Sequence, residues 1–230
     1  MIKLQDFLII IILLQKTYGI MSKQQSVSRE TGDVLILDDT IEEKPYTGDN
    51  EIICWHFSHA KGRCITGVNL LSSLIGYEDI AFSIGFKIIV KDLHFCDVKF
   101  KKEKRQSSTT KNQHVRALIK QAIINQAKFD YLLADNWFGA KDNREFIHYE
   151  LNKFFIFGMK ANRLIAFSEE ERKRGQYQNL NLFSFKDGEK RRVWLKDFAF
   201  PVALVTEIFK NEDDSTGILH IVTYDPILHF

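Results

Sequence analysis

Two aspartates, Asp38 and Asp135, each follow an aliphatic run that is typical of a buried strand. VLIL at 34–37 precedes the first, and YLLA at 131–134 precedes the second. Ligands of α/β sheets gather where strands end, so two such carboxylates could share one cation. Mg²⁺ prefers oxygen ligands, and in phosphodiester chemistry it activates the attacking oxygen and stabilises the leaving one. For either aspartate alone, the alternative is a solvated turn residue or a helix cap.

Asp39 directly follows Asp38, which raises the question of which of them would face a cation. Successive side chains of a strand point to opposite faces, so only one of the two is expected to point into a shared site. The sequence continues DDTIEEKP, and strand alternation alone does not decide which of the two aspartates that is.

The elements that would position these carboxylates alternate between strands and helices. Short runs rich in β-branched and aromatic residues predict strands. Apolar residues at helical spacing from Val115, after a Ser/Thr cluster that could cap them, predict a helix. The expected strands are 33–38, 52–58, 63–68, 82–90, 129–138 and one within 153–163, and a second helix is expected over 140–153. This order predicts an α/β fold.

Positive charge is concentrated in one part of the chain. The whole sequence has a formal net charge of only +2, whereas residues 99–128 contain nine Lys or Arg and one Glu, a local balance of 9 − 1 = +8. Such an uneven surface favours an anionic partner such as DNA. The alternative is an ordinary solvated face.

Cysteine content and hydropathy bear on the compartment. The three cysteines are an odd number without metal-ligand spacing, so we expect reduced thiols and no zinc site. The apolar run Phe7–Leu14 is too short to span a bilayer, and no small-residue cleavage site follows it. We therefore expect a cytoplasmic protein that does not contact a membrane.

Several blocks of the sequence resemble the DDE transposases of bacterial insertion sequences, over about residues 33–225. The blocks are LILDDTIEEKP at 35–45, CWHFSHAKGRCITGVNLL at 54–71, KKEKRQSSTTKN at 101–112, YLLADNWF at 131–138, FIFGMKANR at 155–163, VWLK at 193–196 and IFKNEDDSTGILHIVTYD at 208–225.

The resemblance implies an RNase H-like mixed sheet with flanking helices and a β-rich insertion. It divides the chain into an N-terminal remnant (1–32), the first part of a catalytic core (33–153), the insertion (154–225) and a truncated end (226–230). Asp38 and Asp135 would be catalytic ligands of Mg²⁺ or Mn²⁺, and Asp38 is chosen over Asp39 because it matches the family's D-x-T pattern. A homodimer is compatible with the resemblance. Duplex DNA, both element ends and target, would contact Lys101, Lys102, Lys104, Arg105, Lys111, Lys160, Asn162 and Arg163. Trp137 could stack on a displaced base or pack in the core.

One feature of the family is missing from the sequence. Its third acid lies in a pattern of Tyr, two residues, Arg, three residues, Glu, six residues and Lys, and none of Tyr149, Tyr177 and Tyr224 has Arg at the third following position. The expected chemistry, metal-dependent strand cleavage and strand transfer in DNA transposition, is therefore expected to be impaired. The alternatives are a non-catalytic DNA-binding remnant, an inhibitor of full-length transposase, and a decayed fragment without a stable fold.

Overall fold

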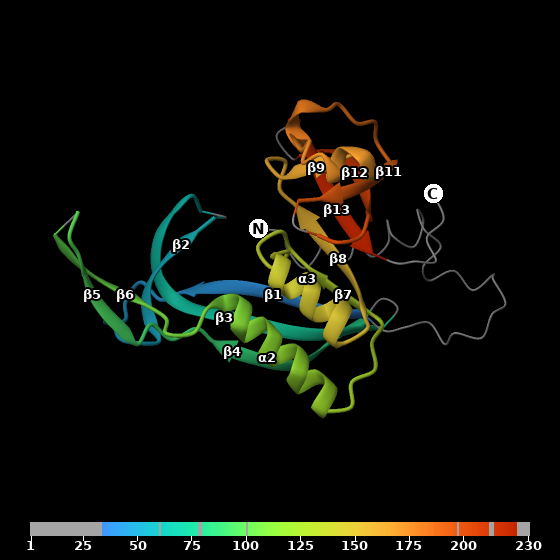
Figure 1. The fold of residues 1–230 in the computed structure, drawn as a ribbon. Coiled ribbons are helices and arrows are strands. Elements are labelled where there is room, and N and C mark those ends of the chain that lie inside the picture. The colour runs from blue at the N-terminus through green and yellow to red at the C-terminus, as the bar shows by residue number, and fades with distance from the viewer. Residues whose placement is uncertain are drawn as a thin grey trace. The chain divides into compact units, whose positions relative to one another are not determined.

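The computed structural model describes residues 34–224, except 60, 78, 79, 100, 197, 212 and 213. These residues form two compact units, one of Leu35–Lys128 and one that begins at Phe129 (Figure 1). The expectations for 1–32, which include the apolar run Phe7–Leu14, and for 226–230 lie outside the described residues. Within the described part of the chain, no helix has the length and apolar character needed to cross a membrane.

The first unit contains a sheet organised around one long strand. Its elements are β1 (Val34–Glu43), β2 (Ile53–Ser58), β3 (Arg63–Tyr77), β4 (Ile80–Ile88), β5 (Leu93–Asp97), β6 (Lys102–Gln106) and α2 (Lys111–Ile124). The first half of β3 pairs antiparallel with β2, its second half pairs antiparallel with β4, and β1 is also its neighbour. Strands β5 and β6 form a separate two-stranded ribbon that extends from the unit (Figure 1).

Helix α2 packs along β3 and β4 (Figure 1). It begins at Lys111, directly after the Ser/Thr cluster that was predicted to cap it, and Thr110 forms a capping box with Gln113. The Gln113 side chain accepts a hydrogen bond from the Thr110 N–H at 2.8 Å, and the Thr110 hydroxyl accepts one from the Gln113 N–H at 3.3 Å. The predicted apolar positions Val115, Leu118, Ile119 and Ala122 are buried, whereas Ile123 is exposed.

The second unit contains a mixed sheet with few helices. Its elements are β7 (Tyr131–Ala134), α3 (Lys141–Glu145), the π-helix η1 (Phe146–Glu150), β8 (Phe154–Met159), β9 (Leu164–Ala166), α4 (Glu169–Lys173), β10 (Gln178–Asn179), the 3₁₀ helix η2 (Leu180–Leu182), β11 (Glu189–Leu195), β12 (Val202–Lys210) and β13 (Thr216–Tyr224). The strand order is β10-β9-β11-β12-β13-β8-β7. Strands β7 and β8 are parallel, and the other strand pairs among the described residues of this unit are antiparallel. The predicted α/β class is confirmed.

The centre of this sheet is apolar on both faces. All four residues of β7 are buried, and so are the last five of β8. The rings of Phe155 and Phe157 stack with centroids 5.2 Å apart. A strand buried on both sides needs such a continuous apolar run, which explains why neither strand alternates with polar residues. The loop that follows β7 therefore begins at the end of a buried strand.

Candidate functional site

Asp135 is the first residue after β7 and is only 3% exposed. The strand covers 131–134, shorter than the predicted 129–138, because the chain turns at once: the Phe138 N–H donates to the Asp135 carbonyl at 3.3 Å. The Asp135 carboxylate accepts a hydrogen bond from the Trp137 N–H at 2.8 Å. Aspartates commonly stabilise a turn with a hydrogen bond of this kind, and here the bond also holds the carboxylate in one orientation.

Asp38 lies inside β1 rather than at its end, so the prediction of a strand that stops at Asp38 was wrong. The strand continues to Glu43. Thr40 and Ile41 are β-branched and suit an extended backbone. At the end of the strand, the Glu43 carboxylate forms an ion pair at 3.0 Å with Arg63, the first residue of β3. Asp38 is half-buried and follows four fully buried residues.

Asp39 forms an ion pair with Lys111, the first residue of α2. The Asp39 side chain is 13% exposed, so this pair is shielded from solvent more than most of the surface pairs. Lys111 was predicted to hold a DNA phosphate, but its ammonium group already has a carboxylate partner. The pairing also separates the roles of the two neighbouring aspartates, since Asp39 is bound to a lysine of its own chain.

The predicted joint site of Asp38 and Asp135 stays a prediction. Asp38 belongs to the first compact unit and Asp135 to the second. Within residues 34–224 as described, no three His, Cys, Asp or Glu side chains lie together in a way that could hold a metal ion.

His56 is buried beside the Cys54 thiol, with its Nε2 3.3 Å from the Cys54 Sγ. Burial lowers the pKa of His56 to about 4, so this histidine is neutral at pH 7.

The basic residues at 101–105 belong to the ribbon of β5 and β6. Lys104 is paired with Asp97, and an Arg105 nitrogen lies 3.6 Å from an Asp49 oxygen. Lys101 and Lys102 are exposed, and Lys101 occupies the turn with a φ of 50°. A two-stranded ribbon is narrow enough to enter the major groove of DNA. The lysines with the greatest freedom to contact phosphates are therefore those nearest the turn.

We expect replacement of Lys101 and Lys102 by Ala to reduce the salt dependence of duplex DNA binding. Each lost phosphate contact lowers the slope of log K against log salt by about 0.9, so the double variant should lose roughly 2. Fluorescence anisotropy with a labelled duplex over a salt series measures the slope. The matched control replaces Lys186 and Lys210, which are exposed lysines of the other unit. Equal slopes for both double variants would show that the ribbon is only a solvated surface.

A basic pocket of about 240 Å³ lies in the second unit, next to the loop that begins at Asp135. Its lining comes from the loop after β7, helix α3, the end of β8 and the turn to β9, the first residue of β9, the end of β11, and β13. The lining residues are Asn136, Gly139, Arg144, Gly158, Met159, Lys160, Asn162, Arg163, Leu164, Leu195, Lys196 and Val222. They include four cationic side chains and no Asp or Glu.

Close backbone packing holds the pocket wall together. A Cβ at Gly158 would lie 3.1 Å from the Asn136 backbone nitrogen, so the absence of a side chain allows the loop to rest on β8. The buried Asn143 side chain donates to the Phe138 carbonyl at 2.9 Å and anchors α3 to the same loop. The Arg163 N–H donates to the Lys160 carbonyl at 3.0 Å and closes the turn between β8 and β9.

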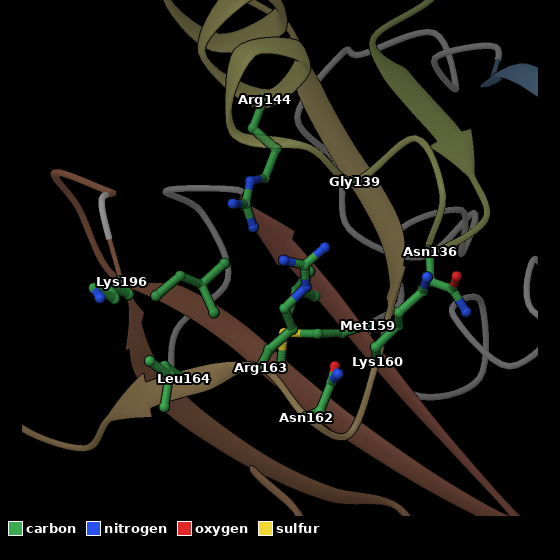
Figure 2. A pocket seen from close by; sticks show the side chains of 12 residues that line it. Asn136, Gly139, Arg144, Met159, Lys160, Asn162, Arg163, Leu164 and Lys196 are labelled. Atoms are coloured by element: carbon green, nitrogen blue, oxygen red, sulfur yellow. The ribbon is translucent and has the colours of Figure 1, made fainter. Parts of the chain in front are cut away.

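The electrostatics of the pocket centre on two arginines. Figure 2 shows the guanidinium groups of Arg144 and Arg163 pointing toward each other across the pocket. Burial, and next the positive charge of Arg163, lower the pKa of Arg144 to about 10. The buried Arg144 Nε and Asn136 Oδ1 have no hydrogen-bond partner among the described residues. The pocket therefore has one unpaired donor, one unpaired acceptor and an excess of positive charge.

Sequence reasoning identified half of the polar groups in this pocket. Lys160, Asn162 and Arg163 were predicted to hold DNA phosphates, and the structure brings these three together. The sequence analysis missed Arg144, Lys196 and Asn136. Arg144 lies on α3, Lys196 follows β11 and Asn136 follows β7, and no local sequence pattern links these three segments to the turn between β8 and β9. Trp137 is 50% exposed, so the interpretation of a core residue was wrong, and the Lys160 ammonium lies 3.6 Å from its ring centroid.

Comparison with known proteins identifies no family for this chain. No family model and no curated protein matches it. One similar solved structure is the NurA nuclease from Sulfolobus solfataricus, with 11% sequence identity and a TM-score of 0.33. The alignment covers 99% of this chain and 81% of that chain.

Proposed function

We propose that this chain is a transposase-derived protein that binds duplex DNA in DNA transposition, with an RNase H-like fold and a β-rich insertion. One observation carries the proposal. The buried Asp135 at the end of β7 is followed directly by Asn136, which lines a pocket with four cations and no carboxylate. A strand-end acid next to a basic, acid-free cavity is a suitable arrangement for phosphodiester chemistry.

Asp38 and Asp135 are the residues that would hold Mg²⁺ or Mn²⁺. Their carboxylates are the hard oxygen donors that these ions prefer, and the Trp137 N–H already orients the Asp135 carboxylate. When bound, the metal would polarise phosphate oxygens and activate the attacking oxygen. The chain's own cations, Lys101 and Lys102 on the ribbon and Lys160 beside the pocket, would hold the DNA backbone without reading its sequence.

A Mn²⁺ titration in the presence of a short duplex tests this proposal. We expect Asp38→Asn and Asp135→Asn each to weaken Mn²⁺ binding at least about tenfold, because each removes one charged ligand of the ion. Isothermal titration calorimetry measures the affinity. Asp39→Asn is the matched control, since the Asp39 carboxylate pairs with Lys111. A loss with Asp39→Asn as large as that with Asp38→Asn would contradict the assignment.

The second candidate function is non-catalytic DNA binding, including inhibition of a full-length transposase. The observation in its favour is the lack of a three-ligand acidic group among the described residues. In this case DNA affinity would be independent of Mn²⁺, and it would survive replacement of Asp38 and Asp135. The same titration, followed by anisotropy with the same duplex, distinguishes the two functions.

A further inference from the structure

We propose that the pocket between Arg144 and Arg163 binds a phosphate group of a nucleic-acid strand, and that the two guanidinium groups grip this phosphate from opposite sides. The inference rests on the proposed function for the identity of the molecule that carries the phosphate. Its physical basis is independent of the metal site, because it depends only on the described residues of the second unit.

The charge distribution of the pocket favours an anion. Arg144 and Arg163 point toward each other, and no Asp or Glu lines the pocket (Figure 2). Neither arginine forms an ion pair with another described residue. Two facing cations repel each other, and after burial this repulsion by Arg163 contributes to the lowered pKa of Arg144, while the Glu145 carboxylate opposes the shift. An anion between them would reverse the sign of that interaction and stabilise both charged groups.

The hydrogen-bonding capacity of the pocket suits phosphate. A guanidinium group presents several N–H donors in a fixed plane, which matches the oxygens of a phosphate group. The buried Arg144 Nε lacks a partner within the described chain, and a buried unpaired donor is costly. The Phe198 ring lies 5.1 Å from the Arg144 guanidinium carbon, so a cation–π contact supports the guanidinium group from one side.

Size and exposure favour a group on a polymer over a small enclosed ligand. The cavity of about 240 Å³ lies below the roughly 300–1,000 Å³ of sites that enclose drug-sized molecules. Asn162, Arg163 and Lys196 are exposed at its rim. The positive potential therefore continues outside the cavity, where neighbouring phosphates of the same strand would lie.

Binding measured without metal tests the inference. Anisotropy with a labelled duplex in the presence of a chelator should show about ten- to hundredfold weaker binding for Arg144→Gln and Arg163→Gln, as expected for the loss of a charge-assisted hydrogen bond. Arg144→Lys should fall between Arg144→Gln and the unaltered chain, because lysine keeps the charge and loses the planar fork. Inorganic phosphate should compete with the duplex for the unaltered chain.

Arg174→Gln is the matched control, since Arg174 is an exposed arginine of the same unit outside the pocket. Arg163 is also exposed, so its replacement should leave the thermal unfolding temperature unchanged and report on binding alone. Equal duplex affinity of Arg163→Gln and Arg174→Gln would overturn the inference. Binding of inorganic phosphate without competition against the duplex would also overturn it, because the pocket would then serve a free anion.

The two proposals can fail separately. The pocket experiment contains a chelator, so loss of the Mn²⁺ dependence at Asp38 and Asp135 leaves its outcome unaffected. Conversely, normal duplex binding by both arginine variants, together with Mn²⁺ binding that requires both aspartates, would remove the pocket and keep the proposed metal site.

Discussion

Duplex DNA that carries cleavable element ends is expected to remain intact when it is incubated with the purified 230-residue chain and Mg²⁺ or Mn²⁺. Under the proposed function, Asp38 and Asp135 are two of three expected acids, and the pattern that would supply the third does not occur after Asp135 in this sequence. Loss of one group that stabilises transition-state charge typically costs on the order of 3 kcal/mol, which is about two orders of magnitude in rate. Denaturing electrophoresis of end-labelled DNA measures nicking and strand transfer.

Metal-dependent nicking that disappears in both Asp38→Ala and Asp135→Ala would contradict this expectation. A substitute acid would then be required, and two glutamates follow Asp135 on the next helical segment. Glu145 is half-buried and lies 3.7 Å from the Lys141 ammonium, whereas Glu150 is exposed. Glu145→Gln and Glu150→Gln would identify which of them takes part, and nicking retained in Asp135→Ala would point to a contaminating nuclease.

Phe157→Ala is expected to lower the free energy of unfolding by about 3–5 kcal/mol, because it removes a fully buried ring and leaves a cavity. Phe157 pairs with Ala134 on one side and with Val222 on the other, so it lies in the middle of the second unit's sheet. Its ring also stacks on Phe155. Urea unfolding followed by circular dichroism measures the loss.

Phe209→Ala is the control in the same unit, and this phenylalanine is 47% exposed. Since the hydrophobic contribution scales with the area removed from water, its loss should be less than half as large. Similar losses for the two variants would show that β8 is not the centre of the core.

Helix α2 and the parallel strands illustrate what could be predicted locally. The apolar spacing of Val115, Leu118, Ile119 and Ala122 predicted the buried face, because residues three and four apart share one side of a helix. The Ser/Thr cluster at 107–110 predicted the cap of the helix, and Thr110 is the capping residue. Strand β1 was predicted to end at Asp38 because charge interrupts its apolar run, but cross-strand neighbours keep the backbone extended to Glu43.

The sequence by itself determined that Asp135 follows a buried strand. The run YLLA before it is continuously apolar, and a strand of this kind is suited to burial on both faces. It also determined the basic composition of 99–128. Only the tertiary structure decided which charges meet. The Lys111–Asp39 pair joins residues that are 72 positions apart, and the pocket combines Arg144 with Arg163 and Lys196. Such contacts depend on strand pairing and on helix packing between distant segments, and no local pattern of residue types encodes them.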